Sequence, residues 1–77
     1  MRILLIEDEE KTSSLIKRGL EENRYKVIAA YDGKSGLSLY KQEQIDLIIL
    51  DIIMPGMSGI DVCNKIREMD ENYPPIL

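Results

Sequence analysis

Two short aliphatic runs, each ended by acidic residues, constrain the fold of this chain more than any other feature. The first run, Ile3–Ile6, stops at Glu7 and Asp8. The second run, Leu47–Leu50, stops at Asp51. A continuous aliphatic run of this length is typical of a strand that is buried on both faces, as in parallel sheets covered by helices. We therefore expect both runs to be strands that end at a surface.

Segments with helical patterning and a weaker apolar run separate these two strands. Leu15, Ile16 and Leu20 recur at helical spacing and predict one apolar face of a helix. Residues 25–30 then supply a second, weaker strand, and Asp32 offers a capping side chain for a short helix. The chain therefore alternates strand, helix, strand and helix before the second aliphatic run.

The last third of the chain continues this alternation. Residues 54–59 contain a proline and two glycines and predict a loop, in which Ser58 is placed to cap a helix. Pro74 and Pro75 follow that helix, and Ile76–Leu77 begins another apolar strand. Such alternation through short loops implies parallel strands, right-handed crossovers and helices on both faces. The sequence therefore predicts an α/β, doubly wound parallel sheet, truncated at the start of its fourth strand.

Composition limits the classes of protein that this chain can represent. The 77 residues fit at most one domain, and 44% hydrophobic with 31% charged residues predict a globular fold. The formal net charge of -4 disfavours direct binding of nucleic acid. With no histidine and Cys63 as the only cysteine, any metal must sit among oxygen ligands. No run has the length of a signal peptide or a membrane span, so we expect a cytoplasmic chain.

The acidic strand ends predict a single site. Functional sites of open parallel sheets lie beyond the carboxyl ends of the strands, where the strand order reverses. If the first and third strands are neighbours, as in a flavodoxin-like order, then Glu7, Asp8 and Asp51 converge. Three close carboxylates disfavour ionisation unless a cation neutralises them, and Mg2+ suits such a site. Asp51 is then the best candidate nucleophile for a phosphoryl group.

The motifs around these acids resemble those of a known family. They are Ile3-Leu4-Leu5-Ile6-Glu7-Asp8-Glu9, Asp46-Leu47-Ile48-Ile49-Leu50-Asp51 and Met54-Pro55-Gly56-Met57-Ser58-Gly59. In this order, and over the whole chain, they resemble the receiver domains of bacterial two-component response regulators. The resemblance implies a flavodoxin-like receiver fold, with residues 1–77 forming a partial receiver domain.

The resemblance also implies a role for individual residues. The implied site residues are Glu7, Asp8, Asp51, Ile53, Pro55 and Gly56. Asp51 would be the phosphoacceptor and a Mg2+ ligand, Asp8 a direct Mg2+ ligand, and Glu7 a ligand that acts through water. Ile53 would offer its backbone carbonyl to the metal. The remaining two residues would shape the loop beside the site.

The same resemblance implies partners for the parent protein. A sensor histidine kinase would supply the phosphoryl group. The acidic pair Glu7-Asp8, in place of two aspartates, is similar to that of regulators with a winged-helix output domain. We therefore expect the parent to be a transcriptional regulator that contacts DNA only through an output domain absent from this chain.

The family's complete domain continues beyond Leu77 with two more strands and two helices, which carry a hydroxyl residue, a lysine and an aromatic switch residue. Without them, we expect the outer edge of the third strand to be unpaired and the apolar sheet faces to be exposed. We also expect an ordered form of this chain to recruit a second copy, by strand pairing or domain swapping.

Two other functions stay open at this point. Metal-dependent phosphotransfer enzymes with a similar sheet usually carry a further acid two positions after Asp51, where this chain has Ile53, so we expect no enzyme. A structural module that is never phosphorylated is the other alternative for a truncated chain. Glu9 and Glu10 are interpreted as acids that meet the dipole of the following helix, and Cys63 as a packing residue.

Overall fold

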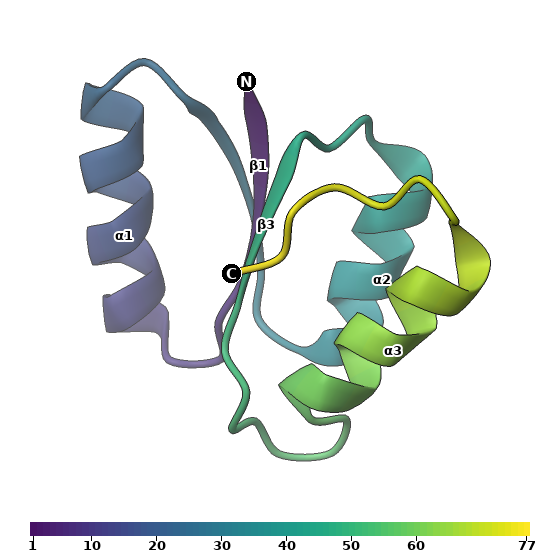
Figure 1. Cartoon of the computed structure of the whole chain (residues 1–77). Helices are drawn as coiled ribbons and strands as arrows, with labels where there is room; N and C mark the ends of the chain where they lie inside the picture. Colours follow the sequence, from purple (N-terminus) through teal and green to yellow (C-terminus); the bar gives the residue numbers. More distant parts are fainter.

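Strands and helices alternate along residues 1–77, all of which the computed structural model describes (Figure 1). The elements are β1 (Arg2–Ile6), α1 (Glu10–Glu22), β2 (Lys26–Ala30), α2 (Gly33–Gln42), β3 (Leu47–Leu50) and α3 (Gly59–Met69). The strands are parallel and lie in the order β2-β1-β3. The predicted α/β sheet with a flavodoxin-like order is confirmed, because β1 and β3 are neighbours. None of the helices combines the length and the apolar character needed to span a membrane.

The sheet carries a helical layer on each face, with α1 on one side and α2 and α3 on the other (Figure 1). Successive residues of β1 alternate between the two layers. Ile3 and Leu5 join the apolar cluster under α1, and Leu4 and Ile6 join the larger cluster under α2 and α3. All four side chains are at most 1% exposed. This burial on both faces explains why the first aliphatic run contains no polar position.

Side-chain caps begin each helix. The Asp32 carboxylate accepts a hydrogen bond from a backbone N–H in the first turn of α2. Ser58 and Asp61 form a capping box at the start of α3. Both caps confirm the sequence-based predictions. Glu9 caps α1 by accepting a hydrogen bond of 2.9 Å from the N–H of Thr12, so this acid serves the helix.

The expected apolar face of α1 is wrong at one position. Leu15 is 69% exposed, whereas Ile16 and Leu20 pack against the cluster under α1. The buried stripe starts instead at Ser13, which is three residues before Ile16 and lies on the same helical face. Successive residues of an α-helix are rotated by about 100° about its axis, so Leu15 leaves the face that Ile16 presents to the sheet.

The outer edge of β3 was expected to be unpaired, and this expectation is also wrong. The N–H groups of Ile48 and Leu50 donate hydrogen bonds of 2.9 and 3.0 Å to the carbonyls of Pro75 and Leu77. The N–H of Leu77 donates in return to the carbonyl of Ile48 (2.8 Å), and Ile48 pairs with Ile76 in a parallel bridge. Because parallel pairing uses alternate residues, this short segment is enough to cover the β3 edge.

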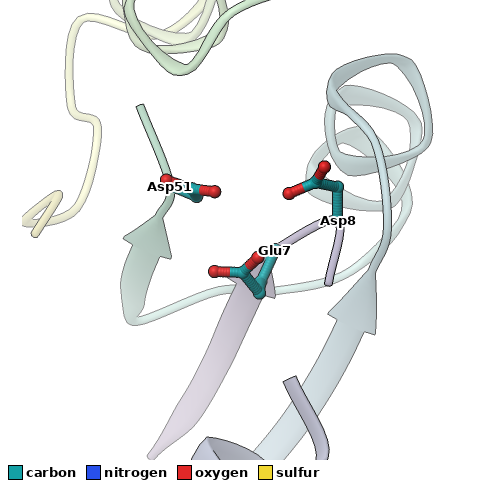
Figure 2. A group of neighbouring side chains, drawn as sticks. All are labelled: Glu7, Asp8 and Asp51. Carbon is teal, nitrogen blue, oxygen red and sulfur yellow. The ribbon is translucent and has the colours of Figure 1, made fainter. Parts of the chain in front are cut away.

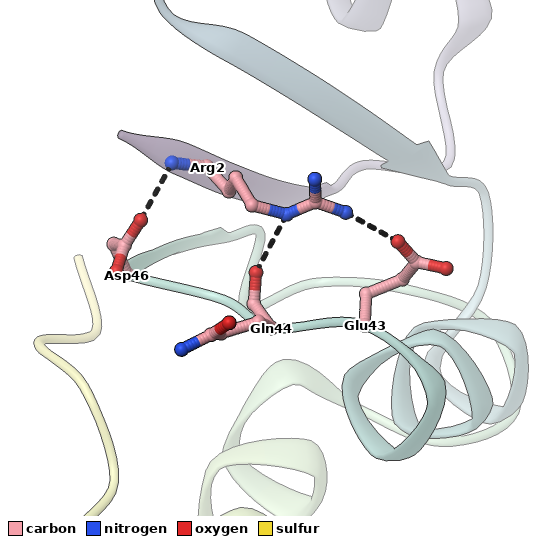
Figure 3. A network of polar contacts seen from close by, with 4 residues as sticks. All are labelled: Arg2, Glu43, Gln44 and Asp46. Carbon is pink, nitrogen blue, oxygen red and sulfur yellow. Dashed lines mark hydrogen bonds and ion pairs between the residues drawn. The ribbon is translucent and has the colours of Figure 1, made fainter.

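Arg2 fixes the start of β3 against the start of β1 (Figure 3). Its N–H donates to the Asp46 carboxylate (2.8 Å), and the N–H of Asp46 donates to the Arg2 carbonyl (2.8 Å). The Arg2 side chain donates to the carbonyl of Gln44 (2.8 Å) and forms an ion pair with Glu43. These contacts hold the loop between α2 and β3. They lie at the amino-terminal ends of β1 and β3, opposite the ends that carry the acids.

Tyr40 joins the two helices on the same face of the sheet. Its hydroxyl donates a hydrogen bond to the carboxylate of Asp70, the residue that ends α3. Burial raises the pKa of Tyr40 to about 12, and the hydrogen bond and charge of Asp70 add to this effect. The hydrogen bond from Tyr40, together with one from the N–H of Asn72, lowers the pKa of Asp70.

The Ser13 hydroxyl is buried without a hydrogen-bond partner, so we expect Ser13→Ala to stabilise the chain. Leaving a buried polar group unsatisfied costs about 1–3 kcal/mol. The replacement also gains helix propensity, and Ser14→Ala at the next, exposed position measures that gain separately. The free energy of unfolding from urea titration should rise by about 1 kcal/mol more for Ser13→Ala than for Ser14→Ala. Equal effects of the two substitutions would show that the Ser13 hydroxyl is satisfied in solution.

The raised pKa of Tyr40 predicts a loss of stability at alkaline pH. A group with a raised pKa in the folded state contributes stability below its ordinary pKa of about 10, and this is lost as the pH rises toward about 12. The free energy of unfolding of Tyr40→Phe should therefore fall less over this range than that of the unsubstituted chain. Urea unfolding at several pH values would measure it, with the exposed Tyr31→Phe as the control. Identical pH profiles for Tyr40→Phe and the unsubstituted chain would contradict this expectation.

Candidate functional site

The site residues begin where the pairing of β1 with β3 ends. Ile6 is paired in register with Leu50, so Glu7 and Asp51 leave neighbouring strands side by side. The N–H of Asp51 donates to the carbonyl of Ile6 (3.0 Å), and the N–H of Glu7 donates to the carbonyl of Ala30 on β2 (3.1 Å). Each acid is thus fixed to the sheet by its own backbone, while its side chain is free to face the open end.

Three carboxylates converge at the carboxyl ends of β1 and β3. One carboxylate oxygen from each of Glu7, Asp8 and Asp51 lies within 4.8 Å of the others. Figure 2 shows the three side chains directed toward a common space, with Glu7 at the end of β1, Asp8 just beyond it and Asp51 after β3. Glu7 and Asp51 are half-buried. The prediction that the two acidic strand ends converge is confirmed.

The electrostatics of the cluster show an excess of negative charge. The N–H of Glu9 donates to the Glu7 carboxylate (2.9 Å), which alone would lower the pKa of Glu7. Partial burial and the negative charges of Asp51 and Asp8 outweigh that hydrogen bond, so the pKa of Glu7 is raised above its ordinary value. A group of close oxygen donors that resist simultaneous ionisation fits a hard divalent cation such as Mg2+.

The loop after Asp51 shapes the other side of the site. The N–H of Ile53 donates to the Asp51 carboxylate (3.2 Å), and the Ile53 side chain is 85% exposed. Met54 is buried in the core and anchors the loop. Gly56 has a φ of 76°, a left-handed conformation that favours glycine, and Pro55 before it is exposed. The loop residues implied by the resemblance, Ile53, Pro55 and Gly56, therefore follow Asp51 closely in the chain and add no charged side chain to the cluster.

Sequence reasoning missed Gly59, which lies against the backbone of Asp51. Its N–H donates to the carbonyl of Ile52 (2.9 Å), and there is no room for a side chain at this position. The available signal was a glycine directly after a capping serine, which we interpreted only as the start of a helix. Close approach of two backbones has no pattern in the sequence that distinguishes it from an ordinary turn.

Comparison with known proteins identifies the family. Residues 3–77 match the family model described as the response regulator receiver domain. The chain belongs to this family. The site geometry agrees with the assignment, because the three acids that carried the resemblance in the sequence are the three that meet in space.

The curated relatives of this receiver chain include transcriptional regulatory proteins. The chain is 37% identical over 76 residues to the alkaline phosphatase synthesis transcriptional regulatory protein PhoP of Bacillus subtilis, covering 99% of the chain and 32% of PhoP. It is 38% identical over 76 residues to the regulatory protein VanR of Enterococcus faecium, covering 99% of the chain and 32% of VanR. The chain therefore spans about a third of the length of these relatives.

Solved structures of receiver proteins share the fold of this receiver chain. The response regulator protein TrrA from Thermotoga maritima, in complex with Mg2+-BeF, is 38% identical with a TM-score of 0.93. The match covers 99% of this chain and 66% of that chain. A second match is the crystal structure of the histidine kinase ThkA in complex with TrrA, with 36% identity and a TM-score of 0.91. It covers 97% of this chain and 66% of that one.

Proposed function

We propose that this chain is a phosphoacceptor module of a two-component response regulator, in which Asp51 receives a phosphoryl group in a Mg2+-dependent step. The convergence of Glu7, Asp8 and Asp51 within 4.8 Å carries this proposal. Family membership and the Mg2+-BeF complex of TrrA support it. Residues 1–77 would form the first three strand–helix units of a receiver domain and the start of a fourth strand.

The residues would divide the work at the site as follows. Asp8 and Asp51 would bind Mg2+ directly, Glu7 would act through water, and Ile53 would contribute its backbone carbonyl. When bound, Mg2+ would offset the negative charge of the carboxylates and of the incoming phosphoryl oxygens. Pro55 and Gly56 would keep the loop folded clear of the Asp51 carboxylate.

In the proposed transfer, one carboxylate oxygen of Asp51 attacks the phosphorus of a phosphohistidine on the kinase. The P–O bond to Asp51 forms as the P–N bond to the imidazole breaks, and the imidazole nitrogen keeps that electron pair and takes up a proton. The product is an acyl phosphate. The Ile53 N–H, which donates to the Asp51 carboxylate, helps to hold that carboxylate in one orientation during the attack.

A sensor histidine kinase is the proposed donor, and the position of α1 supports it. The ThkA complex with TrrA shows that a relative in this family forms such a pairing. Helix α1 starts at Glu10, just after the site residue Asp8, so a protein that reaches Asp51 would pass over its first turns. Leu15 offers that protein an exposed apolar side chain. We further propose a cytoplasmic location, no enzyme activity, and DNA contacts made only by an output domain outside this chain.

Incubation of the 77-residue chain with Mg2+ and acetyl phosphate tests the phosphoacceptor role. We expect intact mass to show one added phosphoryl group, which is absent in Asp51→Asn and absent when Mg2+ is chelated. Asp8→Asn should lower the rate and weaken Mg2+ binding by roughly tenfold or more, because it removes a full ligand charge. Glu10→Gln, an acid outside the cluster, is the matched control and should behave like the unsubstituted chain.

The circular dichroism spectrum decides how a negative result is interpreted. A folded chain that binds no Mg2+ and gains no phosphoryl group would contradict the proposal and would favour the alternative of a structural module. An adduct that persists in Asp51→Asn would assign the phosphoryl group to another residue. The other alternative, a metal-dependent phosphotransfer enzyme, would instead form a phosphorylated small acceptor in amounts beyond one equivalent of the chain.

Self-association of this chain is proposed on a surface other than the one expected from the sequence. The outer edge of β3 is covered, but an apolar groove lies between α3 and the segment after it. Ile52, Ile60 and Leu77 border this groove and are between 58% and 72% exposed. A second copy of the chain that buries these side chains would remove them from water.

Sedimentation velocity over a range of concentrations tests this proposal. The unsubstituted chain should form a dimer as its concentration rises, and Ile60→Lys should raise the dissociation constant about tenfold or more by placing a charge in the groove. Leu15→Lys is the control, because it adds the same charge at an exposed leucine on α1. A monomer at all concentrations, or an equal effect of the two substitutions, would contradict association through the groove.

A further inference from the structure

The first residue of α3 lies in contact with the backbone that carries the phosphoacceptor. A Cβ atom added to Gly59 would lie 2.1 Å from the carbonyl oxygen of Asp51, 2.6 Å from the Cα of Ile52 and 2.8 Å from the carbonyl carbon of Asp51. The N–H of Gly59 also donates to the carbonyl of Ile52. The start of α3 therefore packs on the backbone that follows β3, with no room for a side chain between them.

This contact differs in kind from those of the other helical glycines. A Cβ added to Gly33 would meet the Cγ2 of Val62 at 2.7 Å, and one added to Gly36 would meet the Cδ1 of Ile6 at 2.5 Å. Both neighbours are side-chain atoms, and neither belongs to Asp51 or Ile52. Gly19 has nothing within 4 Å. Only at Gly59 are all three nearest atoms backbone atoms, and all three belong to Asp51 or Ile52.

Helix α3 cannot move away from this contact at low cost. Val62 and Ile66 are fully buried in the core under α3, and the capping box of Ser58 and Asp61 holds its first turn. A side chain at position 59 would therefore press on the segment that leaves β3. The hydrogen bond from the Asp51 N–H to the carbonyl of Ile6 is the last one between these strands, so it would be the first to lengthen.

We propose that Gly59 is a positioning residue for Asp51. By having no side chain, it lets α3 fix the Asp51–Ile52 backbone where the carboxylate faces Glu7 and Asp8. This inference rests on the proposed phosphoacceptor function, and it assigns to α3 the task of aiming the nucleophile. A displacement of about 1 Å at such a site can cost up to roughly a hundredfold in rate.

The test compares Gly59→Ala with Gly33→Ala in the 77-residue chain. Both substitutions introduce a methyl group that strains α3, but only the first touches the Asp51 backbone. Gly19→Ala, which touches nothing, controls for helix propensity. Mg2+ alone is titrated while the amide NMR signals of Glu7, Asp8 and Ile53 are followed, and the rate of phosphorylation by acetyl phosphate is measured. The Mg2+ affinity and the phosphorylation rate are both corrected for the fraction of folded molecules, which is measured by circular dichroism.

We expect Gly59→Ala to weaken Mg2+ binding and to slow phosphorylation by about tenfold or more per folded molecule. Gly33→Ala should lose stability but keep both values within about twofold of the unsubstituted chain, because its methyl group meets side chains and not the Asp51 backbone. If Gly59→Ala folds poorly, sucrose can be added to bring all variants to the same folded fraction. Unchanged binding and rate in Gly59→Ala, or equal losses in Gly33→Ala, would overturn the inference.

One further measurement separates this inference from the proposed function. Hydrogen exchange of the Asp51 amide reports its bond to Ile6 without Mg2+ or phosphate. We expect that exchange to be at least about tenfold faster in Gly59→Ala than in Gly33→Ala, relative to the average amide of each variant. If the unsubstituted chain proves unable to take a phosphoryl group, this result still decides the inference. Equal exchange of the Asp51 amide in the two variants would then overturn it.

Discussion

The parallel pairing of β1 with β3 is the interaction on which the rest of this structure depends. Its last pair, Ile6 with Leu50, sets two acidic residues side by side where the strands end. The apolar clusters on both faces of the sheet keep that pair rigid. If the two strands were separated by another, Glu7 and Asp51 would be too far apart to share a cation, and the same acids would have no common chemistry.

The fold holds these carboxylates together against their mutual repulsion. The raised pKa of Glu7 is the visible sign of that repulsion. Burial of the aliphatic runs supplies the opposing free energy, since each buried side chain of this size contributes about 1.5–3 kcal/mol. The cluster of carboxylates is thus destabilising by itself and is held in place by the buried core. A bound cation, or a change of charge at Asp51, would act on this repulsion.

The flavodoxin-like strand order was implied by the family resemblance. The sequence itself was enough to predict the alternating elements, the caps at Asp32 and Ser58, and the acids at the strand ends. Those predictions depend on local patterns: a fully apolar strand, a capping side chain before a helix, and acids at strand ends. It was not enough to decide which of the adjacent Leu15 and Ile16 faces the sheet, because both positions are aliphatic and the phase of the helix is set by packing. The pairing of Pro75–Leu77 with β3 and the backbone contact of Gly59 were missed for a related reason. Both are contacts between backbones, which side-chain patterns do not encode.

The contacts of Arg2 also bear on the alignment of β3 with β1 along its whole length. Every residue of β3 is aliphatic, so a slip of this strand along β1 by two residues would keep some aliphatic pairs, but it would place Asp46 opposite Leu4 or Asp51 opposite Leu5 in the buried sheet. Such a slip would present an isoleucine where the nucleophile belongs. The reciprocal hydrogen bonds of Arg2 with Asp46 and the ion pair with Glu43 are compatible with one alignment only. An arginine at one end of the strand thereby adds to the constraints that keep Asp51 at the site at the other end.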